Sequence, residues 1–599
     1  MLSPSQSKLK GHSPLAALRP LCYCLAFIGL PVAWPAAVTR WLAYGTAARP
    51  FWAALAAVQA AALIGLACFA HRNRTTYTSV CREIRENSGR KSTVRRLCFT
   101  IAWCLAYALG WSFQASGLSD AGVTLGYLLT TAWIAFAALL AGGLLPEVRA
   151  RWLVASLGTL AVGMALIESR GLDGAGRAIV CWRLEPGSGV IYGEIYGGER
   201  PAPRFVNWLS DRSPDFPCFR GPAGSGRVDG VELATDWRGS PPRPLWRQSI
   251  GNGWGGFAVV DGRAYTQEQR GNDECVVCYQ ATTGQERWAY RERARFTSAT
   301  VGDGPRATPA VCDGRVYAIG GTGILNCLDA LTGERLWSVD VLADNAAGNR
   351  LHGFSNSPLV AHGLVVVSVG GRGHSLVAYH ASDGTRAWQA GDDEAGYGSP
   401  LICTLGGQEQ IVILNTPGIA AHDVLTGAVL WSFAWTNDTR TNCSQPIPVA
   451  GDRLLVSTGY GKGCALLRVA RDADGWSTET LWTSRNLKTK FASAVVAGEH
   501  AFGLDEGILT CIRLTDGSRC WKAGRYGHGQ VLLVNDVLLV QAEDGQIVLV
   551  AADSTAHREL ARQPALDDKT WNYPALAGRL LLVRNDRQAA CFDLPTNYP

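Results

Sequence analysis

Hydrophobic residues are distributed very unevenly along the chain. Up to residue 170 they gather in five long apolar stretches, and the middle three reach the roughly 20 residues that a helix needs to cross a bilayer. Beyond that point, short apolar runs alternate with Gly, Asp and Thr turns, which is the pattern of consecutive β-strands. The sequence therefore predicts a transmembrane helical domain followed by an all-β domain. The five stretches are Pro20–Val38, Pro50–Ala70, Leu97–Ala115, Ala121–Leu145 and Trp152–Ile167.

Charges in the connecting loops predict how this bundle is oriented. The loop Arg72–Arg96 is dense in Lys and Arg, whereas Ser116–Asp120 has neither. Basic loops stay in the cytoplasm, so five spans place the N-terminus inside and everything after Ile167 outside the cytoplasmic membrane. The lipid bilayer is thus an expected partner. No charged residue lies in the middle of a span, which favours an anchor, although a quinone-binding or docking role stays open.

A repeated phrase of apolar strands, a hairpin turn and a tryptophan fills the second part of the chain. Successive copies are about 40 to 50 residues apart, the length of a four-stranded propeller blade. The hairpin glycines supply the positive φ of tight turns, and each indole is expected to pack against the next blade. The copies end at Trp288, Trp337, Trp388, Trp431, Trp482 and Trp521 and carry turn glycines at Gly284, Gly333, Gly384, Gly427 and Gly517.

The count of units predicts an eight-bladed ring. A degenerate seventh unit ends near Leu560, and the last unit, Tyr573–Leu594, lacks an outer strand. Leu245–Ile250 reads as an outer strand with nothing before it, so pairing the two would close the ring and leave no open edge. We therefore expect a helical transmembrane domain over 1–170, an extracytoplasmic linker over 171–243 and an eight-bladed β-propeller over 244–599. Whether the linker packs on the propeller stays open.

Composition and charge narrow the chemistry. A net charge of +6 over 599 residues, without a basic patch interleaved with aromatics, gives no support for nucleic-acid binding. The 18 cysteines do not show zinc-type spacing, and no metal site is expected. Cys511 and Cys520 flank the turn Thr515–Gly517 symmetrically. They could form a disulfide in an oxidising compartment, with two free thiols as the alternative.

Residues that come just before the inner strand of each blade should line one mouth of the axial channel. They are polar and aromatic and include cations, so an anionic or sugar-like ligand would suit them. Acidic residues are nearly absent, which leaves no evident Ca²⁺ ligands and no catalytic base. The candidate ligand-binding residues are Trp254, Arg306, Thr308, His352, Asn356, Tyr397, Gln445, Lys490, His528, Trp571 and Tyr573. No catalytic residue is predicted.

The repeated phrase, roughly A-x-D-x-x-T-G-x-x-x-W, resembles the pyrroloquinoline-quinone-type propeller repeat. Quinoprotein alcohol and glucose dehydrogenases share it with the propeller lipoprotein of the outer-membrane β-barrel assembly machinery. Asp215–Pro222 also looks like the F-R-G-P opening of such proteins. The layout of five spans before a propeller is similar to that of membrane-bound quinoprotein glucose dehydrogenase. The resemblance implies the fold strongly and the function weakly.

Three functions are compatible with the sequence. The preferred one is a non-catalytic scaffold, tethered to the membrane, that binds an envelope protein or a small ligand without a cofactor. The first alternative, implied by the resemblance, is a sugar or alcohol dehydrogenase that uses pyrroloquinoline quinone with Ca²⁺ and reduces membrane quinone. The second is a carbohydrate- or peptidoglycan-binding module, suggested by Trp254, Tyr397, Trp571 and Tyr573 at the expected mouth.

Overall fold

The computed structural model describes residues 167–176, 178–182, 215–298 and 300–597, all of which fall in one compact unit. The five predicted membrane spans lie outside these residues, except that Ile167 already begins the first described strand. Within the described ranges, no helix has the length and apolar character needed to cross a membrane.

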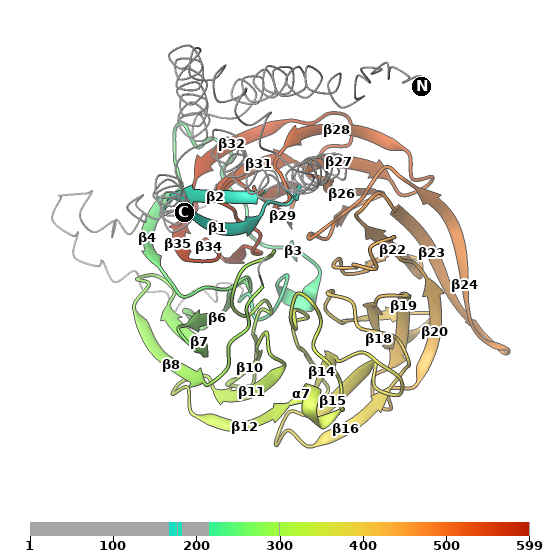
Figure 1. Cartoon of the computed structure of the whole chain (residues 1–599). Helices are drawn as coiled ribbons and strands as arrows, with labels where there is room; N and C mark the ends of the chain where they lie inside the picture. The colour runs from blue at the N-terminus through green and yellow to red at the C-terminus, as the bar shows by residue number, and fades with distance from the viewer. Residues whose placement is uncertain (1–166, 177, 183–214, 299, 598–599) are drawn as a thin grey trace, which may run out of the picture. The chain divides into compact units, whose positions relative to one another are not determined.

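Eight antiparallel sheets follow one another around a ring, which confirms the predicted eight-bladed propeller (Figure 1). Blade 1 consists of β5 (Ala258–Val260), β6 (Arg263–Arg270), β7 (Asp273–Gln280) and β8 (Glu286–Glu292). Blade 2 consists of β9 (Ala310–Cys312), β10 (Arg315–Ile319), β11 (Ile324–Asp329) and β12 (Arg335–Asp340). Blade 3 consists of β13 (Leu359–Ala361), β14 (Leu364–Ser368), β15 (Leu376–His380) and β16 (Arg386–Ala390). Blade 4 consists of β17 (Leu401–Leu405), β18 (Gln408–Leu414), β19 (Gly418–Asp423) and β20 (Val429–Ala434).

The other four blades repeat this meander, and the last borrows a strand from upstream. Blade 5 consists of β21 (Ile447–Val449), β22 (Arg453–Thr458), β23 (Gly463–Asp472) and β24 (Gly475–Ser484). Blade 6 consists of β25 (Val495–Ala497), β26 (His500–Asp505), β27 (Ile508–Arg513) and β28 (Arg519–Arg525). Blade 7 consists of β29 (Gln530–Val534), β30 (Val537–Gln541), β31 (Gln546–Ala551) and β32 (Glu559–Pro564). Blade 8 consists of β33 (Ala575–Ala577), β34 (Leu580–Arg584), β35 (Gln588–Asp593) and β4 (Arg243–Ser249).

Five further elements lie outside this scheme. The hairpin β1 (Ile167–Leu172) and β2 (Ala178–Trp182) precedes the propeller, and α7 (Val341–Asp344) follows blade 2. The short helix η1 (Pro222–Gly224) and β3 (Arg227–Val228) lie near the axis of the ring in Figure 1. β3 pairs in parallel with β29 and makes blade 7 five-stranded.

Ring closure occurs as the sequence predicts. β4 pairs antiparallel with β35, with Trp246 opposite Cys591 and Ser249 opposite Gln588. A strand from the front of the propeller therefore supplies the outer strand of the last blade. The last blade thus has four strands, like blades 1–6.

Each outer-strand tryptophan, with one exception, docks on the following blade. The Trp337 Nε1–H donates to the Ala381 carbonyl of blade 3 at 3.1 Å, and its ring lies on Gly384 of that blade's hairpin turn. The same bond links Trp246, Trp288, Trp388, Trp482 and Trp521 to carbonyls of the next blade. Trp431 instead donates to Gln410 of its own blade. The expected indole contact between blades is thus confirmed at six positions.

Hydroxyl groups connect the inner strands around the channel. At several blades, the amide just before the inner strand donates to a hydroxyl of the following blade. Four pairs join consecutive blades at 2.8–2.9 Å: Gly256 to Thr308, Thr308 to Ser357, Ser357 to Ser399 and Gln445 to Ser493. In a fifth bond, the Ser493 amide of blade 6 donates to the Tyr573 hydroxyl of blade 8 at 2.9 Å. Because these amides would otherwise be buried without a partner, the chain of bonds holds the blades in register around the axis.

Candidate functional site

One face of the propeller collects two kinds of connection. Strand direction alternates within a blade, so the loops between blades lie at the same face as the turns between second and third strands. The predicted mouth residues come from the first kind. Glu543 comes from the second kind, in the turn between β30 and β31. The alternation of strand direction is the signal in the sequence that could have identified it.

One half of this mouth is an aromatic cup with two lysines. Trp254 and Trp571 have ring centroids 5.2 Å apart, and the Lys569 ammonium lies 4.9 and 4.4 Å from them. Lys490 lies 5.2 Å from the ring of Phe491, which also contacts Trp571. Burial lowers the pKa of both lysines. The predicted residues Trp254, Lys490 and Trp571 are therefore brought together, whereas Lys569 was not predicted.

Glu543 and His528 complete this half. The Glu543 carboxylate accepts from Trp571 Nε1–H at 2.8 Å and from the His528 backbone amide at 2.9 Å. His528 is buried, and this burial lowers the pKa of its imidazole. We define the channel-mouth cup as Trp254, Lys490, Phe491, His528, Glu543, Lys569 and Trp571.

A second group of predicted residues lies around Tyr397. The Arg350 guanidinium is 4.7 Å from the Tyr397 ring centroid, and the His352 ring is 5.5 Å from it. Arg306 stacks on Phe296 at 4.6 Å and donates to backbone carbonyls; burial lowers its pKa to about 10. Burial and these two arginines lower the pKa of His352. The group is thus cationic and held by contacts within the protein.

Four predicted residues are buried and take part in hydrogen bonds within the propeller. Thr308, Asn356, Gln445 and Tyr573 are at most 6% exposed. Thr308, Gln445 and Tyr573 belong to the hydrogen bonds that connect the blades, and Asn356 bonds both backbone groups of Ser368. These side chains satisfy backbone groups that would otherwise be buried without a partner. Ligand binding by them stays a prediction.

A segment from the linker region runs across the inner strands. Phe216 bridges Val259 of blade 1, while the Arg220 guanidinium, 1% exposed, donates to Gln445 at 3.2 Å and to the Ala494 carbonyl at 2.8 Å. Arg220 also lies 5.8 Å from the Tyr573 ring centroid. The predicted linker thus packs on the propeller over residues 215–242, with Arg220 in the interior, while residues 183–214 lie outside the described ranges.

The turn of the β1–β2 hairpin also lies in the mouth. It places Gly174 against His528, and the Lys490 ammonium donates to the Gly174 carbonyl at 2.6 Å. Neither this turn nor the Arg220 segment carries a hydrophobic periodicity. A prediction based on repeats therefore finds neither of them.

Cys511 and Cys520 lie on the adjacent strands β27 and β28 as free thiols. Cys511 is opposite Trp521 in the register, and burial together with the neighbouring Cys520 raises its pKa. The two side chains are thus near each other. A disulfide between them stays a prediction.

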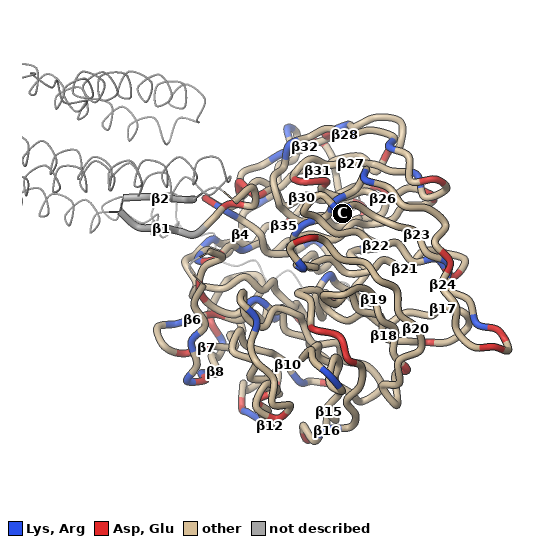
Figure 2. Tube along the Cα trace, turned by 45° about the vertical axis from the view of Figure 1, so that its right-hand side comes forward, with Lys and Arg blue, Asp and Glu red and all other residues tan. Residues whose placement is uncertain are grey.

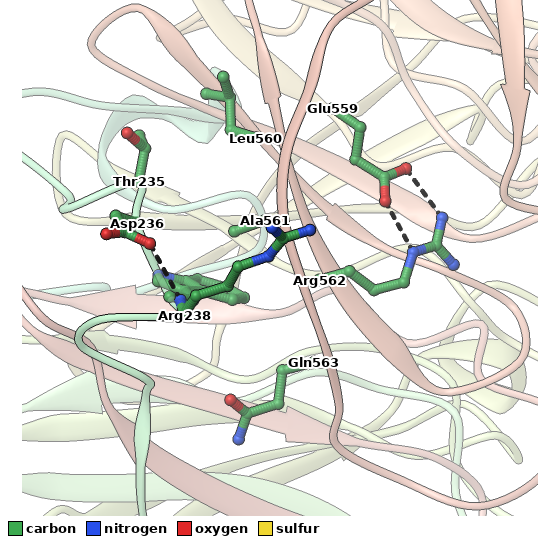
Figure 3. A pocket seen from close by; sticks show the side chains of 9 residues that line it. Thr235, Asp236, Arg238, Glu559, Leu560, Ala561, Arg562 and Gln563 are labelled. Atoms are coloured by element: carbon green, nitrogen blue, oxygen red, sulfur yellow. Dashed lines mark hydrogen bonds and ion pairs between the residues drawn. The ribbon is translucent and has the colours of Figure 1, made fainter.

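A cavity of about 560 Å³ lies far from the mouth, against the outer strand of blade 7 (Figure 3). The segment Thr235–Arg238 forms one wall and β32 the other, with the Glu559–Arg562 ion pair at 2.8 Å on its rim. Trp237 contributes a buried ring whose Nε1 has no hydrogen-bond partner among the described residues. The cavity offers polar groups beside an exposed strand edge.

Surface charge and possible metal ligands are both dispersed in the described residues. Acidic and basic residues are interspersed over the blades in Figure 2. No cluster of three or more His, Cys, Asp or Glu that could hold a metal occurs within the described ranges. The four aromatic residues considered for sugar binding are already in contact with Lys569, Arg350 or Phe219.

Comparison with known proteins gives two kinds of relative. A family model described as outer membrane protein assembly factor BamB matches residues 242–353 and 306–523. The quinohemoprotein alcohol dehydrogenase ADH-IIG of Pseudomonas putida is 30% identical over 244 residues, which is 39% of this chain and 30% of that protein. BamB of Burkholderia pseudomallei is 23% identical over 299 residues, covering 48% of this chain and 73% of that one.

Two of the similar solved structures are those of a BamB and of an alcohol dehydrogenase. BamB from Moraxella catarrhalis aligns with a TM-score of 0.45 and 14% identity, over 59% of this chain and all of that one. The alcohol dehydrogenase ADHIIG from Pseudomonas putida HK5 aligns with a TM-score of 0.45 and 15% identity, over 65% and 81%. In sequence, the chain spans less than a third of the curated alcohol dehydrogenase. The propeller is thus built from PQQ-like repeats, related to those of both BamB and the quinoprotein alcohol dehydrogenases.

Proposed function

We propose that this protein is a non-catalytic scaffold whose propeller binds a protein of the cell envelope. The observation that carries this proposal is that its own chain occupies part of the interior and the mouth of the propeller. Arg220 lies in the interior, and the Gly174 turn lies in the cup at the mouth. The rim and outer strands, with the cavity beside β32, are then open to a partner, and the mouth is a second surface when the Gly174 turn leaves the cup.

The related protein BamB supports a protein partner, because its name describes an outer membrane protein assembly factor. Localisation is part of the proposal. Five spans within 1–170 would anchor the chain in the cytoplasmic membrane with its N-terminus inside. The propeller would then lie on the extracytoplasmic side, as the distribution of Lys and Arg between the loops favours.

A pyrroloquinoline-quinone-dependent dehydrogenase is the second candidate. Two cations and facing indoles in the cup favour it, since the cofactor is flat and carries carboxylates. The donor set does not fit the accompanying Ca²⁺, which needs several oxygen ligands. Glu543 is the carboxylate of the cup, and both its oxygens already accept from N–H groups. These residues therefore agree better with the scaffold.

Reconstitution distinguishes the two candidates. The purified full-length protein is incubated with pyrroloquinoline quinone and Ca²⁺, and bound-cofactor absorbance and sugar- or alcohol-dependent dye reduction are measured. We expect neither signal above that of a variant with Lys490→Met and Lys569→Met. Cofactor bound by the unmodified protein with turnover, and lost in that variant, would overturn the scaffold proposal.

A further inference from the structure

The turn of the β1–β2 hairpin fits the channel-mouth cup at one glycine. Gly174 is buried, and a Cβ added there would lie 2.2 Å from His528 Cδ2. Any residue other than glycine would therefore force the turn or the imidazole to move. The next residue, Ala175, is exposed. The cup thus requires glycine at position 174, whereas the side chain at position 175 is exposed.

The cup matches the polar groups of a peptide backbone. Lys490 donates to the Gly174 carbonyl at 2.6 Å, and Lys569 donates to the Leu172 carbonyl at 2.9 Å. Glu543 accepts from the Gly174 amide at 2.6 Å. Two cationic donors and one anionic acceptor are complementary to two carbonyls and an N–H. The charge of Asp173 in the same turn also acts on this cup, where it opposes the lowering by burial of the pKa of Lys490, Lys569 and His528.

Contacts within the propeller hold these groups in place without help from the turn. Trp571 and the His528 amide orient the Glu543 carboxylate, while aromatic rings flank both ammonium groups. Groups that are fixed before binding lose little conformational entropy when the ligand arrives. The cup therefore has the character of a preformed receptor.

We propose that the channel-mouth cup is a binding site for the backbone of a glycine-containing turn, with the chain's own β1–β2 turn as the resident occupant. A partner protein that presents such a turn binds by displacing the resident one. This inference deepens the proposed scaffold function, because it assigns the partner's chemistry. It also predicts that the resident turn lowers the apparent affinity for a second turn in proportion to its occupancy.

Hydrogen exchange on the full chain tests whether the turn is docked. Gly174→Ala introduces the Cβ that meets His528, and Ala175→Ser is the matched control at the exposed neighbour. We expect the backbone amides around 172–176 to exchange at least tenfold faster in Gly174→Ala and at an unchanged rate in Ala175→Ser. Equal exchange in the unmodified protein and Gly174→Ala would overturn the proposal.

Peptide binding tests whether the cup is a receptor. The probe is the capped pentapeptide Leu-Asp-Gly-Ala-Gly, titrated into the full chain. We expect at least tenfold tighter binding to Gly174→Ala than to the unmodified protein, and loss of binding when Lys490→Met and Lys569→Met are added. Peptide binding that is unchanged by the two lysine substitutions would contradict the proposal. Unchanged far-ultraviolet circular dichroism verifies that each variant is folded. Because neither readout involves a cofactor or an envelope partner, failure here is separable from failure of the scaffold proposal.

Discussion

Tryptophan and glycine act as a pair between blades, at the scale of single residues. The sequence predicted that each indole packs on the next blade, but the contact of its ring with the hairpin glycine is visible only in the structure. Trp431 departs from this pairing, since blade 5 replaces the short hairpin with the long strands β23 and β24. The sequence shows that Trp482 ends a unit without the Thr-Gly turn, but the consequence for the preceding tryptophan depends on contacts between blades. Sequence repeats predict the contacts that all blades share, whereas a departure such as that of Trp431 depends on the surface of the neighbouring blade.

Two glycines of blade 3 allow the energetic effect of the indole contact to be measured separately from that of backbone strain. Gly384 and Gly363 both have positive φ, but a Cβ at Gly384 would lie 2.7 Å from the Trp337 ring, while one at Gly363 would meet nothing within 4 Å. We expect Gly363→Ala to lower the free energy of unfolding by about 1–2 kcal/mol through strain. Gly384→Ala should cost about 1–3 kcal/mol more through overpacking. Urea unfolding of both variants measures the difference, and equal costs would show that the indole contact contributes nothing.

His422 is a buried group that makes the propeller sensitive to acid. Its Nδ1 lies 2.8 Å from the Gly427 carbonyl, which can only accept, so Nδ1 carries the proton and Nε2 is bare. Nε2 has no hydrogen-bond partner in the described part of the chain. Burial lowers the pKa of this imidazole. Protonation would therefore place an unpaired charge in the core.

Because the folded pKa of His422 is depressed, the unfolded chain binds more protons below about pH 6.5, and stability falls as the pH drops. Between pH 6.5 and 5, one such group costs at most about 2 kcal/mol. His422→Asn keeps a donor toward Gly427 but does not titrate. We expect this variant to lose less stability than the unmodified protein between pH 7.5 and 5, as measured by thermal unfolding. Identical pH slopes would contradict the assignment.

Among the structural elements, the segment from Phe216 to β3 packs inside the propeller, and we call it the internal plug. It contacts blades 1 and 7 and places Arg220 between blades 5 and 8. The sequence indicated it only by its resemblance to an F-R-G-P opening, because it has no strand or helix periodicity. A buried arginine in an irregular segment is explained by the carbonyls it reaches, and those come from residues far apart in sequence.

Removing the Arg220 guanidinium should loosen this plug. Arg220→Met would leave the Gln445 side-chain oxygen and the Ala494 carbonyl without their donor, and we expect a loss of about 2–4 kcal/mol of stability. Arg227→Met is the control, because its ion pair with Asp229 is exposed and should matter by less than about 0.5 kcal/mol. Guanidinium-induced unfolding compares the two. A smaller effect at Arg220 than at Arg227 would contradict the plug.

Architecture was well predicted at the scale of the whole molecule, and the site less so. Eight blades and closure by the upstream strand followed from counting repeats, from a strand left over at the front and from a last unit that lacks its outer strand. The cup was found only in part: Lys569 lies earlier in its loop than the residues next to the inner strand, Glu543 depends on which turns share a face, and the Gly174 turn depends on a segment outside the repeats. Local patterns determine blades, while the mouth is assembled from loops that no repeat constrains.

Topology remains a prediction, since the spans lie outside the described residues. Fusion of alkaline phosphatase after the last blade should give active enzyme in intact bacterial cells, because that reporter folds only outside the cytoplasm. A green fluorescent protein fusion at the same position should be dark. The reverse pair of signals would place the propeller in the cytoplasm and overturn the proposed orientation.

The pairing of β4 with β35 has a consequence for biosynthesis. β4 leaves the ribosome more than 300 residues before its partner, so its backbone groups must wait unpaired through most of translation. A nascent chain that stalls or is cleaved before Gln588 keeps that edge available to any other strand. Closure of the ring therefore depends on the synthesis of Gln588–Asp593, which gives the waiting strand its partner.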